Sequence, residues 1–234
     1  MAHLFRFFIN PNDIKENEAV IKEKGLIFRI SRVLRLQPIE RIAVLDNKGN
    51  EYLCSIKSIS NNEIYLGVLK KGFYKEKLIV NAYIPLIKKD KFELIVEKLT
   101  EIGVSRIIPI LSKNCKIKSI NIERLKKIAK ESAEQSGKYI IPEIDKVITL
   151  NNAVERVTGL NIVLYRNAKD KIESLKNKTE KEINLFLGPE ADFADEEIDN
   201  FIKNKFNLVT LGKQIFKTET AAIIGTYVIK ELSN

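Results

Sequence analysis

The sequence has almost no histidine, and this excludes several kinds of active site. His3 is the single histidine among the 234 residues, and it lies close to the N-terminus. A Ser-His-Asp triad, a Cys-His pair and an HExxH zinc site each require a histidine inside the fold, so we expect none of them. We also predict no metal site. An enzyme with this sequence would have to use carboxylates, lysines, arginines, backbone groups and a bound cofactor.

Other features that the sequence lacks exclude further kinds of site and protein. Cys54 and Cys115 are far apart and form no CxxC pair, so we expect two buried free thiols. Neither GxGxxG nor GxxxxGK[ST] occurs, which argues against a dinucleotide-binding fingerprint or a P-loop. The sequence has no apolar run of membrane-spanning length and no recognisable cleavable leader, so we expect a cytoplasmic protein without membrane contact.

Positive charge is in excess. The chain carries 40 lysines and arginines against 31 acidic residues, a formal net charge of +9. An apolar content of 44% with 30% charged residues is typical of a folded protein rather than a disordered one. The basic excess favours a polyanionic partner such as nucleic acid, although charge alone does not determine the fold.

The first 72 residues indicate a small β-barrel. Residues 41–45 and 51–56 flank the turn-rich segment 46–50, a pattern typical of a β-hairpin. Short apolar runs at residues 4–9 and 64–69 add two more strand candidates. Short strands at this spacing predict a barrel domain over residues 1–72.

From residue 73 onward, strand-like and helix-like segments alternate. Apolar residues recur at helical spacing from Phe92 to Ile102, where Gly103 can end a helix, and residues 122–136 form a second helix before Gly137. Helices are also expected from Asp195 and from Thr218, whose hydroxyl could cap the last one. The expected strands are residues 78–87, 106–111, 161–165, 183–187 and 207–211. Such alternation predicts an α/β domain with a doubly wound parallel sheet over residues 73–234.

Two loops follow predicted strands of this sheet and contain glycine. Open parallel sheets bind ligands at the carboxyl ends of their strands, where residues 187–193, LGPEADF, and residues 211–218, LGKQIFKT, should lie. Glycine lets a ligand approach the backbone closely. Either loop taken by itself also fits an ordinary strand-to-helix connection.

Taken together, these loops resemble the signature of a known family. LFLGPEADFADEEI followed by LVTLGKQIFKTETA resembles the paired motifs of the RsmE family, uridine-N3 methyltransferases of small-subunit ribosomal RNA within the SPOUT superfamily. KKDKFELIVEKLTEIGVSRIIPILSKNC and ESAEQSGKYIIPEI resemble two further family motifs, and HLFRFF and RVLRL resemble the start of its PUA-like barrel. The resemblance extends over nearly the whole chain.

The chain departs from the usual family text at several positions. Ala191-Asp192 replaces a pair of glycines, and Gln214 and Lys217 replace two arginines. Lys138 stands where the family has a further arginine, and Ser31-Arg32 replaces a common histidine. These departures concern the substrate contacts more than the cofactor pocket.

The resemblance implies a fold and a cofactor. It implies a SPOUT-type parallel sheet with a C-terminal trefoil knot, preceded by the PUA-like barrel. The knot would bring both loops around one molecule of S-adenosylmethionine. The implied cofactor-binding residues are Leu164, Leu187, Gly188, Pro189, Glu190, Leu211, Gly212, Ile215, Phe216 and Thr218. Gly212 is expected to keep its loop open for the ligand.

The resemblance also implies the reaction and its partners. The expected substrate is a uridine of 16S ribosomal RNA in the small subunit, and the expected assembly is a homodimer. N3 of the uridine must lose a proton before it is methylated, and nearby cations would stabilise the negative charge that then develops on the base. We assign that role to Arg6, Lys138 and Lys217. Glu190 and Glu219 are expected to be structural. Phosphate contacts are assigned to Arg32, Arg35, Lys70 and Lys71.

Two other readings stay open. A non-catalytic RNA-binding protein with a SPOUT-like fold would share the barrel and the basic surface, although the retained Gly188 and Gly212 favour a working pocket. A SPOUT methyltransferase with another RNA target, such as transfer RNA, would lack the long N-terminal barrel.

Overall fold

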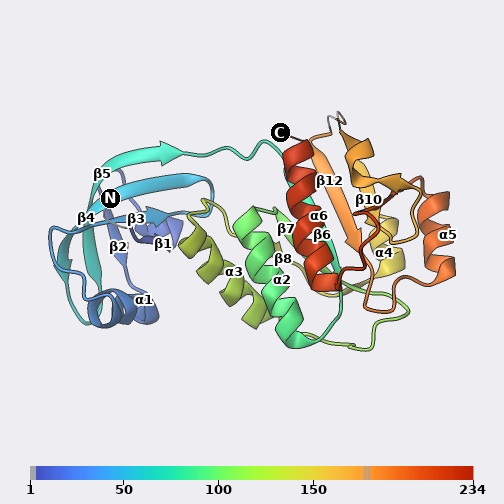
Figure 1. Ribbon diagram of the computed structural model, residues 1–234. Coiled ribbons are helices and arrows are strands. Elements are labelled where there is room, and N and C mark those ends of the chain that lie inside the picture. Colours follow the sequence, from blue (N-terminus) through green and yellow to red (C-terminus); the bar gives the residue numbers. More distant parts are fainter. Residues whose placement is uncertain (1–3, 177, 179, 234) are drawn as a thin grey trace. The chain divides into compact units, whose positions relative to one another are not determined.

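The chain forms two compact units. The computed structural model describes residues 4–176, 178 and 180–233, and His3 therefore lies outside the described residues (Figure 1). One unit consists of Met1–Glu76 with Ala133–Ile141, and the other of Lys77–Ser132 with Pro142–Asn234. The division predicted at residue 72 had placed residues 73–76 and 133–141 in the second domain.

The first unit is a curled five-stranded sheet with short helical segments. The strand order is β1-β3-β4-β5-β2, so β1 and β2 form its two edges and the unit is a half-barrel. β1 runs parallel to β3, and the other pairs are antiparallel. Its elements are β1 (Arg6–Phe8), η1 (Pro11–Asp13), β2 (Glu18–Ile21), α1 (Lys24–Phe28), η2 (Arg29–Val33), β3 (Arg41–Leu45), β4 (Asn50–Ile59) and β5 (Ile64–Phe73).

The hairpin between β3 and β4 was predicted and is confirmed. The carboxylate of Asp46 accepts hydrogen bonds from the backbone N–H of Lys48 at 2.8 Å and of Asn50 at 3.0 Å. Gly49 adopts a φ of +94°, which other residues rarely tolerate. Apolar side chains of all five strands and of α1 then fill one core beneath the sheet.

Residues 133–141 belong to this unit because a buried acid attaches them to it. One oxygen of Glu134 accepts a hydrogen bond from the backbone N–H of Phe8 at 3.2 Å. The other lies 2.7 Å from Nη1 of Arg29, and only 3% of the Glu134 side chain is exposed. A carboxylate this deeply buried is tolerated when both of its oxygens are paired.

The second unit is an α/β domain built on a parallel sheet, as predicted. The strand order is β11-β13-β10-β12-β6-β7-β8, with β9 also pairing with β7, and the pairs are parallel. Its strands are β6 (Ile79–Pro85), β7 (Arg106–Leu111), β8 (Glu143–Ile144), β9 (Ile148–Thr149), β10 (Leu160–Leu164), β11 (Asp170–Lys171), β12 (Glu182–Leu187) and β13 (Asn207–Thr210). Its helices are α2 (Lys89–Ile102), α3 (Ile122–Ser136), α4 (Leu150–Val154), η3 (Ile172–Leu175), α5 (Asp195–Lys203) and α6 (Thr218–Leu232).

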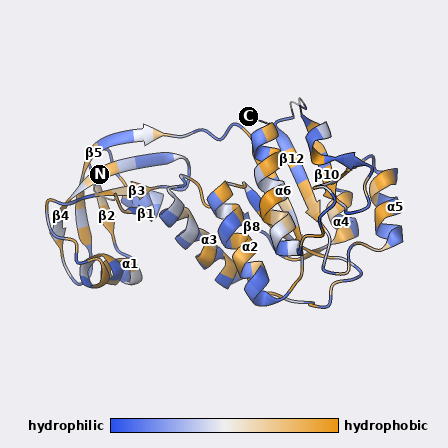
Figure 2. Cartoon of the chain, viewed as in Figure 1, coloured by the Kyte–Doolittle hydropathy of each residue, from blue (hydrophilic) through white to orange (hydrophobic). Residues whose placement is uncertain are grey.

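Helices cover both faces of this sheet. Phe186 of β12 lies 4.0 Å, centroid to centroid, from the ring of Tyr83 and contacts Phe201 of α5 edge-on at 5.5 Å. α4 and α5 share that cluster, while α2 and α6 pack on each other over the opposite face. In Figure 2, hydrophobic and hydrophilic residues alternate along α2, α3 and α6. No helix in the described part of the chain has the length and apolarity to cross a membrane.

The strand register places the two glycine-containing loops together. Leu164 at the end of β10 is in register with Leu187 of β12 on one side and with Val209 of β13 on the other. The three strands therefore end at the same edge of the sheet. Residues 188–194 and 211–217 both start from that edge.

Candidate active site at the ends of β10, β12 and β13

A pocket of about 590 Å³ opens at this edge. This volume lies within the roughly 300–1,000 Å³ typical of small-molecule sites. Every predicted cofactor-binding residue except Gly212 lines it: Leu164, Leu187, Gly188, Pro189, Glu190, Leu211, Ile215, Phe216 and Thr218. Apolar side chains and the backbone of two loops line the pocket together. Such side chains can hold an aromatic ring, and the backbone groups can form hydrogen bonds with its edge.

The two loops are joined at the start of α6. The hydroxyl of Thr218 donates a hydrogen bond to the carbonyl oxygen of Gly188 over 3.3 Å. The prediction that Thr218 caps α6 was wrong, because Lys217 is the N-cap residue and makes no side-chain cap. Thr218 already has helical backbone, which leaves its buried hydroxyl available to the neighbouring loop.

Each loop glycine has its own structural reason. A Cβ at Gly188 would lie 2.9 Å from Oδ1 of Asp192 and 3.3 Å from the backbone nitrogen of Phe193. Gly212 instead has a φ of +119°, and an added Cβ would meet only the end of the Gln214 side chain, at 3.3 Å. Gly188 is therefore required for close packing within its loop, whereas Gly212 is required for the turn itself.

Lys91 lines the pocket but was not predicted. Its Nζ lies 2.5 Å from Oε1 of Glu190 and 3.8 Å from Oε2 of Glu219. The hydrogen bond from Lys91 is the largest of the effects that lower the pKa of Glu190 below its ordinary value. Lys91 stands in the first turn of α2, within the KKDKFE stretch that carried part of the family resemblance. That stretch was the available signal, but nothing in it indicated contact with the 188–194 loop.

Asp192, which stands where the family has glycine, also lines the pocket. Its φ of +62° is positive, a conformation that aspartate tolerates better than most residues. Its Oδ1 accepts a hydrogen bond from the backbone N–H of Phe193 at 2.8 Å. Burial raises the pKa of this carboxyl above its ordinary value, while the Phe193 bond and the charge of Arg166 act in the opposite direction.

The three predicted catalytic cations lie in different units. Lys217 is exposed and lines the pocket of the second unit. Arg6 and Lys138 belong to the first unit. There Nε of Arg6 lies 3.0 Å from Oε1 of Glu51. The Arg6 guanidinium packs beside Gly137, and a Cβ added to that glycine would lie 3.8 Å from it. The structure thus brings Lys217 alone of the three into this pocket.

The four predicted phosphate-binding residues all belong to the first unit and are exposed. Arg32 is in η2, and Arg35 follows it with a φ of +53°. Lys70 and Lys71 are on β5, where Nζ of Lys71 lies 5.3 Å from the ring centroid of Tyr52. A lysine over an aromatic ring, with an exposed charge beside it, is compatible with nucleic-acid binding.

Comparison with known proteins identifies the family. Residues 75–230 match the model of an RNA methyltransferase domain, and residues 30–69 match that of an RNA methyltransferase PUA domain. Ribosomal RNA small subunit methyltransferase E of Mesomycoplasma hyopneumoniae is 30% identical over 94% of this chain and 96% of the relative. This chain belongs to that methyltransferase E family. The protein of the same name from Rickettsia conorii is 29% identical over 93% of this chain and 91% of its own.

Solved structures agree with this assignment at the level of the fold. The ribosomal RNA small subunit methyltransferase E of Neisseria gonorrhoeae, solved with bound S-adenosyl methionine, superposes with a TM-score of 0.89 at 22% identity over 98% of both chains. A protein from Legionella pneumophila, solved in complex with the bound cofactor SAM, gives a TM-score of 0.88 at 22% identity over the same shares. The predicted RsmE resemblance is confirmed, as is the order of a PUA-like unit followed by a parallel α/β unit.

Proposed function

We propose that this protein transfers a methyl group from S-adenosylmethionine to N3 of a uridine in 16S ribosomal RNA of the small subunit. The observation that carries the proposal is the pocket that residues of both the 187–190 and the 211–218 loops line, in a chain of the methyltransferase E family. The relatives' names specify small-subunit ribosomal RNA.

The pocket suits S-adenosylmethionine in size and chemistry. Leu164, Leu187 and Phe216 offer apolar surface for an adenine ring, and the backbone of the two loops offers donors and acceptors for its edge and for the ribose. Glu190 and Asp192 place carboxylates on the wall, where they can face a cationic ligand. When bound, the cofactor supplies an activated methyl group on a sulfonium.

We assign to Lys217, Arg6 and Lys138 the role of supplying positive charge near the reacting uracil. Loss of the N3 proton leaves negative charge on the flanking carbonyl oxygens of uracil, and a lysine or arginine directed at them stabilises it. Lys217 lines the pocket itself. Glu190 already binds Lys91, so we assign it to holding the loop rather than to taking the proton.

The first unit would hold the RNA. Arg32, Arg35, Lys70 and Lys71 are exposed on a unit that includes a match to an RNA methyltransferase PUA domain. Contacts of these side chains with phosphates would make binding strongly dependent on salt. The target base would have to be unstacked to reach a pocket.

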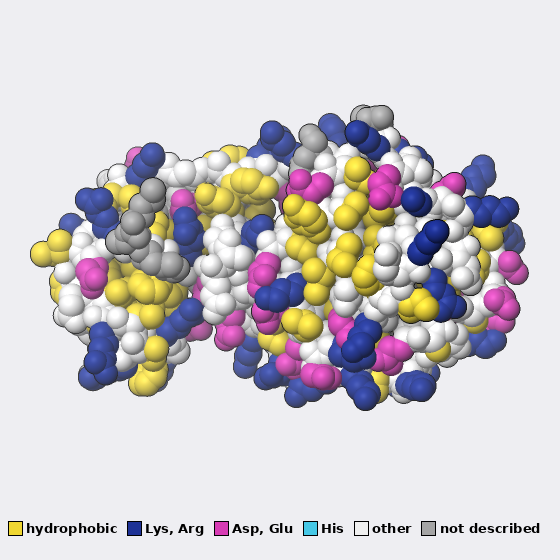
Figure 3. Space-filling model, in the orientation of Figure 1, with side chains coloured by type: hydrophobic (Ala, Val, Ile, Leu, Met, Phe, Trp, Pro, Cys, Tyr) yellow, Lys and Arg dark blue, Asp and Glu magenta, His cyan; other side chains and the backbone are white. Residues whose placement is uncertain are grey.

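We also propose a homodimer, a trefoil knot through the 188–194 and 211–217 loops, and action in the cytoplasm. Support for the dimer comes from α6, whose outer face carries Ile223, Ile224, Tyr227 and Val228. Tyr227 is 55% exposed, and hydrophobic side chains gather over this helix in Figure 3. An apolar patch of this kind commonly marks an interface.

Calorimetric titration of S-adenosylmethionine into the wild-type protein and a Gly212→Val variant tests the proposal. We expect the wild type to bind and the variant to lose binding, because valine cannot adopt a φ of +119° without moving the loop. If the wild type does not bind, with RNA absent or present, the methyltransferase proposal fails and a non-catalytic RNA-binding protein is favoured.

A further inference from the structure

A second, smaller cavity shares a wall with the cofactor pocket. Its volume is about 180 Å³, and Pro189, Glu190 and Ala191 line both cavities. The other walls come from the connection between β6 and α2, which contributes Lys88, and from the loop after β7, which contributes Lys116. We call this cavity the lysine cleft. Apart from this shared wall, the lysine cleft lies outside the proposed cofactor site.

The walls of the lysine cleft are fixed by hydrogen bonds. Nδ2 of Asn114 donates to the carbonyl oxygen of Asp192 at 3.0 Å. The backbone N–H of Lys113 donates to Oε1 of Glu197 at 2.8 Å, which ties the same loop to the start of α5. The loop after β7 is therefore attached both to the 188–194 loop and to the start of α5. A cavity held in this way is ready to receive a ligand without reorganisation.

The charges in the lysine cleft favour an anion. The side chains of Lys88 and Lys116 are exposed, and in the described part of the chain neither side chain forms a hydrogen bond or an ion pair. Glu190 is the one acid among the described lining residues, and Lys91 already binds it at 2.5 Å. Lys88 and Lys116 also act on this carboxyl, since their charges contribute to lowering its pKa. Because Lys91 satisfies the acid, the positive charge of the other two lysines remains available.

We infer that the lysine cleft binds a backbone phosphate of the substrate RNA, on the strand next to the target uridine. The inference rests on the proposed function and adds an RNA contact on the methyltransferase unit. A cavity of about 180 Å³ is below the roughly 300 Å³ at which small-molecule pockets begin, so a phosphate suits it better than a whole nucleoside. Lysine is a common partner of phosphate as a point charge. The shared Glu190 wall would hold this phosphate beside the pocket where the base reacts.

Glu190 and Lys91 would then have a defined part in RNA binding. An unpaired carboxylate at the rim would repel a phosphate, and the 2.5 Å contact with Lys91 offsets that charge. Lys91 would thus act as a positioning residue for the wall and for the RNA together. The phosphate itself would contact Lys88 and Lys116.

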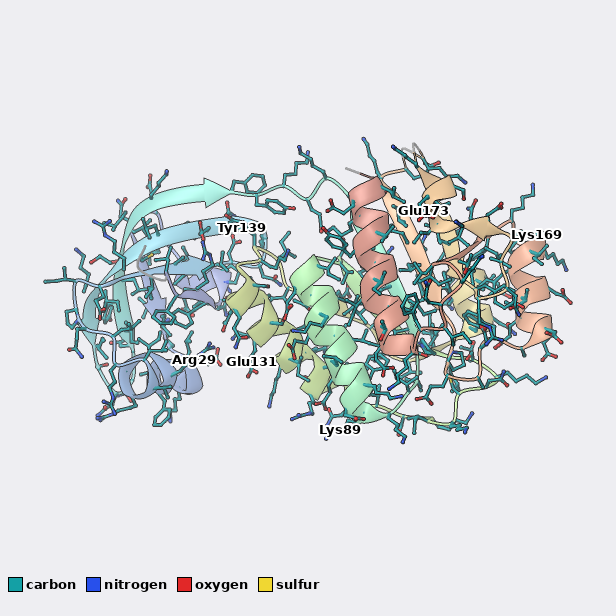
Figure 4. All side chains as sticks on the ribbon, viewed as in Figure 1. Arg29, Lys89, Glu131, Tyr139, Lys169 and Glu173 are labelled. Atoms are coloured by element: carbon teal, nitrogen blue, oxygen red, sulfur yellow. The ribbon has the colours of Figure 1, made fainter. Side chains whose placement is uncertain are left out.

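The test compares two double variants that remove the same charge from the same two segments. Lys88→Gln with Lys116→Gln alters the lysine cleft. Lys89→Gln with Lys118→Gln is the matched control, because neither residue lines the cleft. Lys89 lies in the first turn of α2, where Figure 4 shows it projecting from the end of the helix. Each protein is titrated with a single-stranded fragment of small-subunit ribosomal RNA at several salt concentrations, and separately with S-adenosylmethionine.

We expect the cleft variant to bind the RNA about tenfold more weakly, with a salt slope reduced by about 0.7, the contribution of one phosphate on a single strand. The control should change RNA affinity by less than about threefold, and cofactor affinity should not change in either variant. Equal weakening by both variants would overturn the inference, because it would indicate a general field rather than a site. Loss of cofactor binding in the cleft variant alone would also overturn it, because the cleft would then hold part of the cofactor.

Methylation by the wild type, measured with the same RNA, distinguishes failure of the lysine cleft from failure of the proposed function. A wild type that methylates, together with cleft and control variants that behave alike, refutes the lysine cleft only. A wild type that binds RNA without methylating it refutes the proposed function, while the two affinities still decide the cleft. A wild type that binds no RNA refutes both.

Discussion

The hydroxyl of Thr218 donates a hydrogen bond to the carbonyl oxygen of Gly188 across 3.3 Å. This bond joins the first residue of α6 to the loop after β12, and both residues line the same pocket. Two residues that are 30 positions apart in the sequence are therefore held in one surface. The proposed cofactor site depends on that connection.

Replacing Thr218 with valine should weaken cofactor binding without unfolding the protein. Valine has nearly the same shape but no hydroxyl, so the half-buried Gly188 carbonyl loses its partner, at a cost of about 1 kcal/mol. We expect a roughly fivefold loss of S-adenosylmethionine affinity by calorimetry. Thr220→Val is the control, because the Thr220 hydroxyl makes no hydrogen bond in the described chain. Equal losses in both variants would argue against the connection.

Gly188→Ala should have a larger effect on the same pocket. The added methyl group would lie 2.9 Å from Oδ1 of Asp192 and 3.3 Å from the Phe193 nitrogen, so the loop has to move. We expect cofactor affinity to fall by more than about tenfold, while unfolding temperature changes little. Gly72→Ala is a suitable comparison, since a Cβ there meets only the Glu51 carbonyl oxygen at 3.9 Å. Normal binding by Gly188→Ala would show that the loop is not part of the site.

The half-buried carboxyl of Asp192 should make the stability of the protein depend on pH. Burial raises the pKa of its carboxyl, so the folded protein holds this proton at a pH where the unfolded chain, with an ordinary value of 3.8, has released it. The contribution of Asp192 to stability is present below that ordinary value and is lost as pH rises through the raised pKa. In the Asp192→Asn variant, stability should no longer fall in this way as pH rises. The measurement is the difference in unfolding free energy between wild type and variant from pH 3 to pH 7. A difference that does not vary with pH would contradict the argument.

Glu134→Gln tests the attachment of residues 133–141 to the half-barrel. The variant keeps the shape of the side chain but removes the charge that pairs with Arg29 at 2.7 Å. We expect a loss of about 2 kcal/mol in unfolding free energy by urea denaturation, and faster hydrogen exchange at the Phe8 amide. Glu131→Gln, on an exposed turn of the same helix (Figure 4), should change neither. Matching behaviour of the two variants would contradict the assigned role.

Long periodic segments were predictable from the sequence, and short ones were not. The bounds of α3 and β7 agree with the prediction, and α2 ends before Gly103, whose φ is +94°. β2, α1, α4 and η3 were missed because segments of about five residues are too short to establish a period. Gly25 inside α1 further weakened that signal. The sequence did not indicate that residues 133–141 pack with the first unit, because a contact between Glu134 and Phe8 is not visible in the local sequence pattern.

The site was predictable to the extent that it comes from two continuous loops. Leu164, Leu187, Ile215 and Phe216 could be assigned to the pocket because the resemblance extends over the strand ends and the loop that carry them. Lys91 could not be assigned, since it reaches the pocket from the start of a helix nearly a hundred residues before Glu190. Its contact depends on how α2 packs on α6, which only the structure gives.

The most direct test of the central claim is analysis of the methylated nucleoside. Small-subunit ribosomal RNA lacking the modification is incubated with the protein and S-adenosylmethionine carrying an isotopic methyl group, then digested to nucleosides and examined by mass spectrometry. We expect label in N3-methyluridine, and loss of that label with the Gly188→Ala variant. Label in any other nucleoside, or none from a wild-type protein that binds the cofactor, would contradict it.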